Sequence, residues 1–365
     1  MEDEFYMQLA LELAEMGRGW VNPNPMVGAV IVKDGRIIGR GYHRRYGELH
    51  AERNALADCK EDPKGATMYV TLEPCCHYGK TPPCTEAVVA YGIKRVVIGA
   101  MDINPEVSGK GAMFLREHGI EVRTGVLQEA CEQLNKIFFH YMRTGMPYVV
   151  YKYAMTLDGK TATHTGESRW ISGEQARAQV HEIRHQLMGI MVGNGTVQTD
   201  DPHLDCRKPN GRDPIRIICD THLGIPLTSY VVQTAKEQPT IIATACEDSR
   251  RCADYQSCGC EILQIPTNGG HLDLKALMYE LGKRKIDSIL LEGGAQLGWA
   301  ALEAGIVNEI RAYIAPKLFG GALAATPLTG KGVALPEEAF LLRNIMVRQI
   351  DTDILVTAEV EERRC

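Results

Sequence analysis

Apolar and polar residues follow two different periods along this chain, and the changes of period outline its helices and strands. Helical spacing of apolar residues begins at Tyr6, and a strand-like apolar run begins at Val27. The pair Asp34-Gly35 follows that run and predicts a hairpin. Further helices are predicted at 50–60, 84–92, 110–118 and 128–142, and strands at 67–72, 95–101 and 120–126. Strands interleaved with helices in this way predict a sheet covered on both faces.

The pattern is interrupted at residues 143–147, where Gly145 and Pro147 follow a predicted helix. Glycine and proline together mark a break, and 365 residues exceed one typical core, so we expect domains 1–145 and 146–365. The second domain has predicted strands at 148–154, 189–193, 215–219, 240–244, 261–265 and 288–292, and helices at 173–187, 271–283 and 294–304. The last strands, at 308–315, 343–350 and 353–359, have little helix between them, which predicts an antiparallel edge on a mostly parallel sheet.

Composition and charge exclude several classes of protein. Hydrophobic residues make up 45% of the chain and charged residues 24%, as in ordinary globular proteins. The net charge of −6 argues against a nucleic-acid partner, which calls for a basic surface. We find no run of about eighteen apolar residues and no signal peptide, so no membrane association is expected. The 12 cysteines are then expected to be thiols or metal ligands, and the location cytoplasmic.

The most specific chemical signal is a group of histidine, glutamate and cysteine residues in the first domain. His50 and Glu52 open a predicted helix, Cys75 follows a predicted strand, and Cys84 opens a second helix. One imidazole and two thiolates hold a zinc ion and leave its fourth position open to water, whose pKa then falls toward about 7. Because helix N-termini favour thiolates, Cys84 is expected to ionise readily. Glu52 is expected to be the catalytic residue that carries a proton from water to a departing amine.

The alternative is a closed zinc site that only staples loops together. Such a site needs a fourth ligand, for which Cys76 and His77 are available. The adjacent Cys75 and Cys76 are poorly placed to bind one ion together, and a closed site leaves Glu52 without a role. We therefore favour an open, catalytic site.

These motifs resemble those of a known superfamily. His50-Ala51-Glu52 with Pro74-Cys75 is similar to the signature of cytidine-deaminase-like enzymes, in which the second cysteine usually follows as Cys-x-x-Cys. Here the longer insert 76–83 separates the two cysteines. Together with Asn22-Pro23-Asn24-Pro25 and Gly28, it resembles the bifunctional deaminase/reductase family of riboflavin biosynthesis, and the resemblance covers nearly the whole chain. Many relatives carry serine where this chain has Cys76, which implies that Cys76 is not a required ligand.

For the first domain, the resemblance implies a three-layer cytidine-deaminase-like fold and a substrate. The substrate is 2,5-diamino-6-(5-phosphoribosylamino)pyrimidin-4(3H)-one, deaminated at ring carbon 2. Matching positions place contacts near the pyrimidine at Asn24 and His43, and contacts near the ribose phosphate at Lys80, Asp102 and Asn104. The ordinary alternatives are a turn asparagine, a surface histidine and a solvated loop lysine for Asn24, His43 and Lys80.

In the second domain the residues alone say less. Glu292-Gly293-Gly294 ends one predicted strand and starts a helix, and Gly193-Asn194-Gly195-Thr196 ends another. Glycines at such turns let backbone amides approach a phosphate, and two such strand ends in one sheet can form one cleft. The pattern is not the dinucleotide fingerprint Gly-x-Gly-x-x-Gly, and an ordinary connector is the alternative.

The resemblance adds a reaction to this domain. The segments 152–160, 168–171, 193–196, 200–204 and 292–294 are similar to the family's reductase domain, which resembles dihydrofolate reductase. The implied reaction is NADPH reduction of the ribosyl group of 5-amino-6-(5-phosphoribosylamino)uracil to ribityl, and the preference for NADPH rests on the resemblance alone. The implied cofactor contacts are Ala154, Trp170, Thr196, Asp200 and Gly294, and the implied contacts to the sugar phosphate are Ser168, Arg184, Leu204, Arg207 and Glu292.

Simpler readings exist for several of these residues. Arg184 suits a phosphate because a guanidinium grips two oxygens at once, but it also fits a solvated helix face. Trp170 also fits a core position. Lys152 and Asp200 are both candidates for proton delivery. The cluster of Cys252, Cys258 and Cys260 lacks a nearby histidine and is expected to be loop thiols.

Two other classes of protein compete with a two-step enzyme on a small-molecule ribotide. A nucleic-acid deaminase needs a basic, aromatic-lined channel, which this acidic chain with 6% aromatic residues does not supply. The second competing class is a binding module that is held together by zinc and senses a nucleotide. Deaminase activity would distinguish the enzyme from such a module. We also expect a homo-oligomer, although the sequence does not give the oligomeric state.

Overall fold

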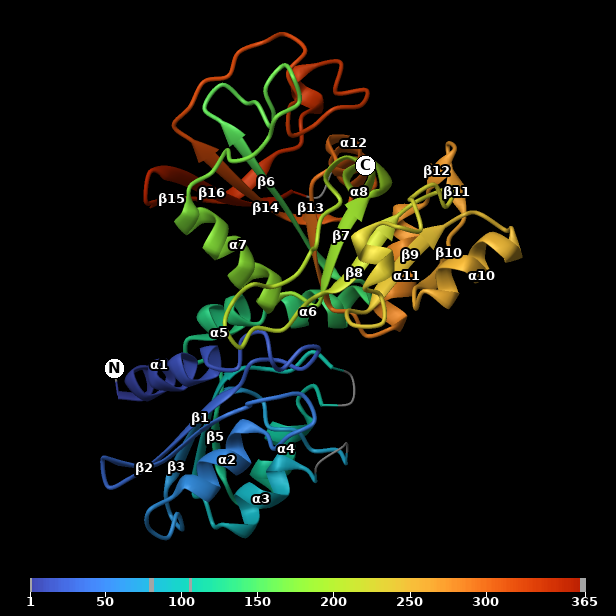
Figure 1. Cartoon of the computed structure of the whole chain (residues 1–365). Helices are drawn as coiled ribbons and strands as arrows, with labels where there is room; N and C mark the ends of the chain where they lie inside the picture. The colour runs from blue at the N-terminus through green and yellow to red at the C-terminus, as the bar shows by residue number, and fades with distance from the viewer. Residues whose placement is uncertain (1, 79–81, 105–106, 362–365) are drawn as a thin grey trace. The chain divides into compact units, whose positions relative to one another are not determined.

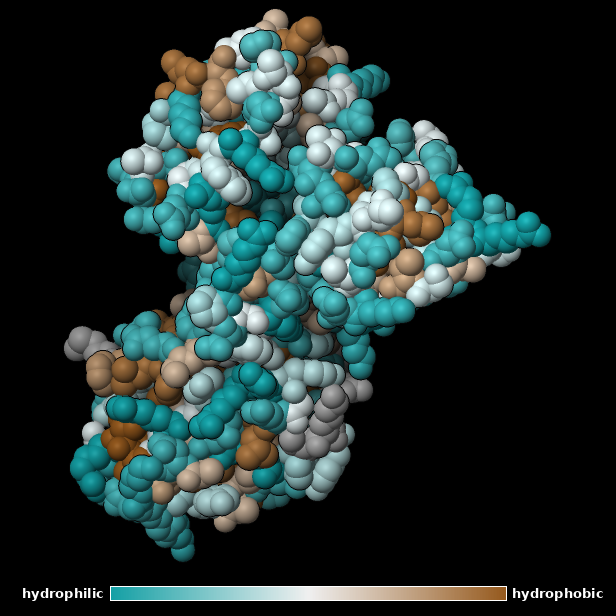
Figure 2. All heavy atoms as spheres, viewed as in Figure 1, coloured by the Kyte–Doolittle hydropathy of each residue, from teal (hydrophilic) through white to brown (hydrophobic). Residues whose placement is uncertain are grey.

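The computed structural model describes residues 2–78, 82–104 and 107–361 of the chain. The chain divides into two compact units, Met1–Gly145 and Met146–Cys365 (Figure 1). None of the helices in the described residues is both long enough and apolar enough to cross a bilayer. Most of the surface in the space-filling view is hydrophilic, with scattered hydrophobic side chains on each unit (Figure 2).

The first unit is built on a five-stranded sheet with the order β2-β1-β3-β4-β5. Its strands are β1 (Gly28–Lys33), β2 (Arg36–Tyr42), β3 (Thr67–Leu72), β4 (Arg95–Ala100) and β5 (Glu121–Arg123). The predicted hairpin is confirmed, because β1 and β2 pair antiparallel around Asp34 and Gly35. The strands β3, β4 and β5 are parallel, so the carboxyl ends of β3 and β4 lie at the same edge of the sheet.

Helices cover both faces of this sheet, as the alternating pattern predicts. One core packs α2 (Ala51–Asp58), α3 (Cys84–Ala90) and α4 (Lys110–Glu117) against side chains such as Ile31 and Val96. The other packs α1 (Glu2–Glu15), α5 (Gln128–Leu134) and α6 (Lys136–Thr144) against side chains such as Val30 and Val97. Because neighbouring residues of one strand point to opposite faces, the two cores confirm three layers (Figure 1).

The single helix predicted at 128–142 is wrong, because the helix is broken at Asn135. This residue separates α5 from α6 and has φ −106° and ψ 22°. Its buried amide group accepts a hydrogen bond from Met26 N at 2.8 Å and donates one to Met26 O at 2.9 Å. A side chain that pairs with distant backbone in this way competes with helix continuation, and the helical period of apolar residues does not reveal it.

The second unit is built on a nine-stranded sheet with the order β10-β9-β8-β7-β13-β6-β14-β16-β15. Its strands are β6 (Tyr148–Thr156), β7 (Gly189–Gly193), β8 (Ile215–Cys219), β9 (Thr240–Thr244), β10 (Glu261–Gln264), β13 (Ser288–Glu292), β14 (Val307–Ala315), β15 (Leu342–Ile350) and β16 (Asp353–Val360). Pairing is parallel from β10 to β14 and antiparallel for β16 and β15. The predicted antiparallel edge is therefore confirmed.

The helices of this unit include some that the sequence pattern did not predict. Those predicted are α7 (Glu174–Gln186), α11 (Leu274–Lys283) and α12 (Ala295–Glu303), and those missed are α8 (Asn194–Asp200), α9 (Tyr230–Gln233), α10 (Ser249–Ser257) and the short 3-10 helix Pro336–Glu338. The helix predicted to begin at 271 begins instead at Leu274. Residues 271–272 form β12 (His271–Leu272), which pairs with β11 (Thr267–Asn268), and Asp273 caps α11 through a bond from Ala276 N at 3.0 Å.

Among the described residues, the cysteines of the second unit belong to no group of three ligand atoms close enough to hold a metal ion. Cys252 lies in α10 rather than in a loop, and it is buried with Cys260 in an apolar core against β8 and β9. Cys258 packs against the same core. Among the described residues, which leave out Cys365, no cysteine forms a disulfide bond.

Candidate active sites

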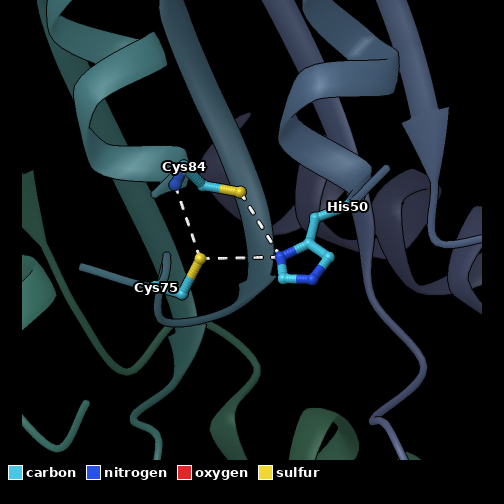
Figure 3. A group of neighbouring side chains, drawn as sticks. All are labelled: His50, Cys75 and Cys84. Atoms are coloured by element: carbon cyan, nitrogen blue, oxygen red, sulfur yellow. Dashed lines mark hydrogen bonds between the residues drawn. The ribbon is translucent and has the colours of Figure 1, made fainter. Parts of the chain in front are cut away.

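Three elements of the first unit bring His50, Cys75 and Cys84 together (Figure 3). His50 is the residue before the first turn of α2, Cys75 follows β3, and Cys84 is the first residue of α3. His50 Nδ1 lies 3.5 Å from both Cys75 Sγ and Cys84 Sγ. The ligand atoms of these three residues all lie within 4.8 Å of one another, close enough to share a metal ion. One nitrogen and two sulfurs converging in this way fit a zinc ion.

The two sulfurs of this site share one proton, so the pKa of one falls while the pKa of the other rises. The Cys84 thiol and the His50 imidazole donate to Cys75, which lowers the pKa of Cys75 to about 4. The same bond from Cys84 and its burial raise the pKa of Cys84. The N–H at the start of α3 points at Cys75, because Cys84 N lies 3.4 Å from Cys75 Sγ, and this bond stabilises a thiolate at Cys75. That Cys84 ionises readily, with zinc holding it deprotonated, stays a prediction.

Glu52 lies in the first turn of α2 and is almost completely buried, with 3% of its surface exposed. Burial, reinforced by the negative charge of Cys75, raises the pKa of Glu52 to about 6. The Cys84 sulfur lies within hydrogen-bonding reach of this carboxyl group. A carboxyl group with a pKa near neutrality, next to the three converging ligand atoms, is suited to take up and release a proton.

Close packing of α2 on β2 sets the position of His50 and Glu52. A Cβ atom on Gly41 would lie 2.2 Å from Ala55 N and 2.5 Å from Ala51 O, so only glycine permits this approach. Arg53, on the same helix, donates to Pro82 O at 3.2 Å and Pro83 O at 2.8 Å. The helix that carries His50 and Glu52 is thereby tied to the turn that presents Cys84.

Glu73 is a site residue that the sequence reasoning missed. Its buried carboxylate accepts backbone N–H bonds from Asp102 at 3.3 Å, Gly109 at 3.0 Å and Ala112 at 3.0 Å. It therefore joins the end of β3 to the end of β4 and to the start of α4, just before Cys75. The signal in the sequence was a glutamate between a strand and Pro74, but its partners lie 29 to 39 residues away.

Asn24 and His43, predicted near the pyrimidine, contact each other. His43 is 2% exposed, so the surface-histidine alternative is wrong. Its Nδ1 lies 3.1 Å from Leu49 O, a carbonyl that only accepts, so this nitrogen carries the proton and Nε2 accepts from Asn24 Nδ2 at 3.1 Å. Burial also lowers the pKa of His43, which favours the neutral ring. The His43 and His50 rings lie 5.3 Å apart, so this pair adjoins the ligand group.

Of the residues predicted near the ribose phosphate, two are described and Lys80 lies outside the described residues. Asp102 follows β4, the strand next to β3, and accepts a hydrogen bond from Asn104 N at 2.8 Å. Burial raises the pKa of Asp102 to about 6, and the negative charges of Glu73 and Cys75 add to this effect. Asp102 therefore lies on the same edge of the sheet as Cys75.

In the second unit, the two glycine-rich strand ends lie next to each other, because β7 and β13 are parallel neighbours. Gly293 and Gly294 have φ of +77° and +78°, a backbone conformation that favours glycine. A Cβ on either glycine would lie 3.5 Å from Thr196 Oγ1 in α8, so Thr196 borders this turn. Gly294 also precedes α12, whose first turn has no side-chain cap among the described residues.

A buried group of charges lies at the end of β13, beside Lys152 in the middle of the neighbouring strand β6. Arg184 and Glu292 form a two-point ion pair with both N–O distances 2.9 Å, and their side chains are 14% and 12% exposed. Lys152 Nζ lies 3.9 Å from the same carboxylate. Burial alone raises the pKa of Glu292, but the charges of Arg184 and Lys152 outweigh it and hold that pKa at about 2. The solvated-face alternative for Arg184 is wrong, because its guanidinium is committed to Glu292.

The other predicted reductase residues are distributed around this group. Trp170 is 60% exposed beneath the Arg177 guanidinium, 4.5 Å from the ring centre, so it is not a core residue. Ala154 is half-buried in β6, Ser168 is half-buried in the loop between β6 and α7, Asp200 ends α8, Leu204 is buried after α8, and Arg207 is exposed and pairs with Asp205 at 3.1 Å.

Comparison with known proteins assigns each unit to a family. Residues 1–100 match the model of the cytidine and deoxycytidylate deaminase zinc-binding region. Residues 147–356 match the model of the RibD C-terminal domain. The chain is thus composed of a cytidine-deaminase-like domain followed by a RibD reductase domain.

Several known proteins are similar to this chain over both of its domains. The riboflavin biosynthesis protein RibD of Actinobacillus pleuropneumoniae is 51% identical over 98% of this chain and 95% of its own, and that of Escherichia coli K12 is 46% identical over 88% and 89%. The solved structure of the Thermotoga maritima diaminohydroxyphosphoribosylaminopyrimidine deaminase/5-amino-6-(5-phosphoribosylamino)uracil reductase has a TM-score of 0.84 at 38% identity, over 98% of this chain and 99% of that one. Acinetobacter baumannii RibD has a TM-score of 0.88 at 37% identity, over 99% of both chains. This chain belongs to the RibD family of riboflavin biosynthesis proteins.

Proposed function

We propose that the chain catalyses two successive steps of riboflavin biosynthesis. The first unit deaminates 2,5-diamino-6-(5-phosphoribosylamino)pyrimidin-4(3H)-one at ring carbon 2. The second unit reduces the ribosyl group of the product, 5-amino-6-(5-phosphoribosylamino)uracil, to ribityl. The observation that carries the first step is the convergence of His50, Cys75 and Cys84 beside a buried carboxyl group with a pKa of about 6, that of Glu52.

His50, Cys75 and Cys84 would hold the zinc ion, since their donor set and separation fit its tetrahedral preference. When bound, zinc supplies a Lewis acid that lowers the pKa of water and polarises it for attack. The Glu52 carboxylate carries both protons of the attacking water in turn: the first goes to the ring nitrogen as water adds to carbon 2, and the second goes to the amino nitrogen on carbon 2. The bond to that nitrogen breaks, ammonia leaves, and the carbonyl of the uracil product remains.

Contacts of the described residues favour a pyrimidine ring in this site. The tautomer of His43 is fixed by Leu49 O, and His43 in turn orients the amide of Asn24. A side chain whose direction is fixed in this way is suited to bind a ring edge, because little conformational freedom is lost on binding. Asp102 and Asn104 lie at the adjacent strand end and are proposed to face the ribose phosphate, together with Lys80.

NADPH is the proposed reductant, and when bound it supplies the hydride. Two features of the second unit fit such a cofactor: the Gly293–Gly294 turn, whose positive φ angles favour glycine and leave room for a phosphate, and the start of α12, which favours an anion. Ala154, Trp170, Thr196 and Asp200 are proposed to complete the cofactor contacts.

The charged group at the end of β13 is proposed to bind the sugar phosphate. Because its pKa is about 2, Glu292 stays ionised at neutral pH and accepts hydrogen bonds from sugar hydroxyls. Arg184 fixes the orientation of that carboxylate through two bonds rather than meeting the phosphate alone. Arg207, which is exposed, is the proposed phosphate ligand, with Ser168 and Leu204 beside it.

The test is a coupled assay with purified, zinc-loaded protein. The diaminopyrimidine ribotide is added, and ammonia release is followed before and after addition of NADPH. We expect one ammonia per substrate without NADPH, and NADPH oxidation that starts only once deaminated product has formed. Ammonia release that persists undiminished after zinc removal by a chelator contradicts the first step, and a stable NADPH signal in the presence of deaminated product contradicts the second.

We further propose a homo-oligomer. The outermost strand β15 has no strand on its free edge among the described residues, and it exposes Ile345, Met346 and Val347, which are 60%, 54% and 65% exposed. An exposed apolar edge strand is a surface on which another chain readily pairs. Light scattering with size exclusion measures the state, and a single-chain mass at all concentrations contradicts the proposal. The cytoplasmic location stays a prediction.

A further inference from the structure

The segment 201–207 follows α8 and has neither helical nor strand structure. An irregular backbone lacks the partners that a helix or sheet provides, so its buried carbonyl groups need other donors. Buried side chains from distant elements supply them. Arg216 Nε donates to His203 O at 3.0 Å, and Gln238 Nε2 donates to Leu204 O at 3.1 Å. Two successive carbonyl groups are thus fixed from β8 and from the turn before β9.

The next carbonyl is held as well. Arg184 Nη1, from α7, donates to Asp205 O at 2.9 Å, in addition to its pair with Glu292. Arg207 N then lies 3.2 Å from His181 Nδ1. The segment is therefore fixed residue by residue up to Arg207, and one of its anchors belongs to the buried charged group itself.

Arg216 is unusual among these anchors, because it is the largest fully buried side chain, with 1% of its surface exposed. A buried arginine ordinarily pairs with a carboxylate. In the described part of the chain, the guanidinium of Arg216 is instead satisfied by His203 O, by Thr234 Oγ1 at 2.8 Å and by Val231 O at 3.4 Å. Its burial is unfavourable, and burial lowers its pKa. The bond that Arg216 donates to His203 O fixes the backbone at His203.

Gln238 holds the strained point of the segment. Leu204 has φ +56°, a conformation that a branched side chain adopts only when its surroundings impose it. Gln238, 5% exposed, divides its amide donors between Leu204 O and Pro214 O, the latter at 2.8 Å. Without these donors, both carbonyl groups lose their partner and the conformation of Leu204 loses its support.

We propose that Arg216 and Gln238 are positioning residues for the reductase step. They touch neither substrate nor cofactor; they hold the backbone at 203–204 so that Leu204 and Arg207 meet the phosphoribosyl group. The proposal rests on the proposed function, since it takes Leu204 and Arg207 as substrate contacts. It predicts that loss of either anchor weakens binding of the phosphorylated substrate and leaves binding of NADPH unchanged.

The test compares Gln238→Met with Gln233→Met in the full-length, zinc-loaded protein. The first change keeps the length of the side chain and removes both donors. The second removes an exposed amide that, among the described residues, donates to Leu227 O at 2.7 Å rather than to a carbonyl of the segment. For each, KM and kcat are measured with 5-amino-6-(5-phosphoribosylamino)uracil and with NADPH. Hydrogen exchange is followed in peptides that cover 201–207.

For Gln238→Met we expect KM for the ribotide to rise about tenfold or more, which is the loss of roughly one buried hydrogen bond. KM for NADPH stays within about twofold, deamination is unchanged, and exchange rises at 201–207 alone; Gln233→Met behaves as wild type. An unchanged ribotide KM, or an equal rise in both KM values, overturns the proposal. If Gln238→Met fails to fold, Arg216→Lys takes its place, because lysine keeps the positive charge but loses the several N–H donors of the guanidinium. The same comparison of KM for the ribotide with KM for NADPH then decides. Wild-type protein that does not oxidise NADPH refutes the proposed function instead, and the exchange data still decide whether the anchors hold the segment.

Discussion

Replacing Gly41 with alanine tests how closely the packing of α2 controls the deaminase site. A Cβ at this position would lie 2.2 Å from Ala55 N, whereas ordinary contact begins at 3.4 Å. The difference, 3.4 − 2.2, requires the helix to move by about 1.2 Å. His50 and Glu52 stand at the start of that helix, so they move with it.

A displacement of this size has a calculable effect on rate and stability. A misplacement of about 1 Å costs on the order of a hundredfold in rate. Overpacking also lowers the free energy of unfolding by about 1–3 kcal/mol. We therefore expect Gly41→Ala to bind zinc more weakly and to release ammonia about a hundredfold more slowly. Zinc per chain is measured by mass spectrometry of the metal, and ammonia release by a coupled enzyme.

Gly35→Ala is the matched control, because its Cβ would meet nothing within 4 Å. With φ +73°, this change strains the hairpin turn by about 1–2 kcal/mol but does not push on α2. It should lower the melting temperature and leave zinc content and ammonia release intact. NADPH oxidation with the deaminated intermediate shows that the second unit is folded in both variants. Gly41→Ala protein with full zinc and a wild-type rate would refute the reasoning.

Three further changes test other parts of the account. Cys76→Ser should keep one zinc per chain, and a halved metal content in metal analysis would make Cys76 a ligand. The hydrogen bond from Arg95 helps to lower the pKa of Asp3 from 3.8 to about 2, so ionised Asp3 stabilises the fold above pH 4, and this stabilisation is lost as pH falls toward 2. Asp3→Asn should therefore lower the free energy of unfolding, measured by chemical denaturation, by up to about 2 kcal/mol at pH 7 and by little at pH 2. Equal losses at both pH values would contradict this assignment. Glu292→Leu leaves Arg184 buried without its carboxylate, so the second unit should lose about 3–5 kcal/mol in chemical denaturation, and a more stable variant would disprove the role of the pair.

The parts of the fold that the sequence predicted are those that local pattern determines. The strand at 67–72 and the hairpin at Asp34-Gly35 follow from period and turn chemistry, and both are found in the structure. The break at Asn135 and the helix α8 were missed for opposite reasons. Asn135 lies in a good helical pattern and is removed from it by a bond to Met26, while α8 carries glycine and polar residues with only Val197 buried.

The candidate sites show the same division. His50, Cys75 and Cys84 were predicted as one group because one imidazole and two thiolates form an open zinc site, and the structure places them together. Glu73 and Arg53 were missed, because they act on backbone groups that are distant in the sequence. The sequence also could not show that Arg184 forms an ion pair with Glu292, because α7 must pack against the sheet to bring the two charges together. The substrate and cofactor contacts stay predictions.

The most direct test of the central claim uses Glu52→Gln, which keeps the size of the side chain and removes its ability to exchange a proton. Zinc content, ammonia release from the diaminopyrimidine ribotide, and NADPH oxidation with the deaminated ribotide are measured on the same preparation. The account predicts one zinc per chain, ammonia release reduced by at least about a hundredfold, and unchanged NADPH oxidation. Ammonia release at the wild-type rate from zinc-loaded Glu52→Gln protein would contradict it.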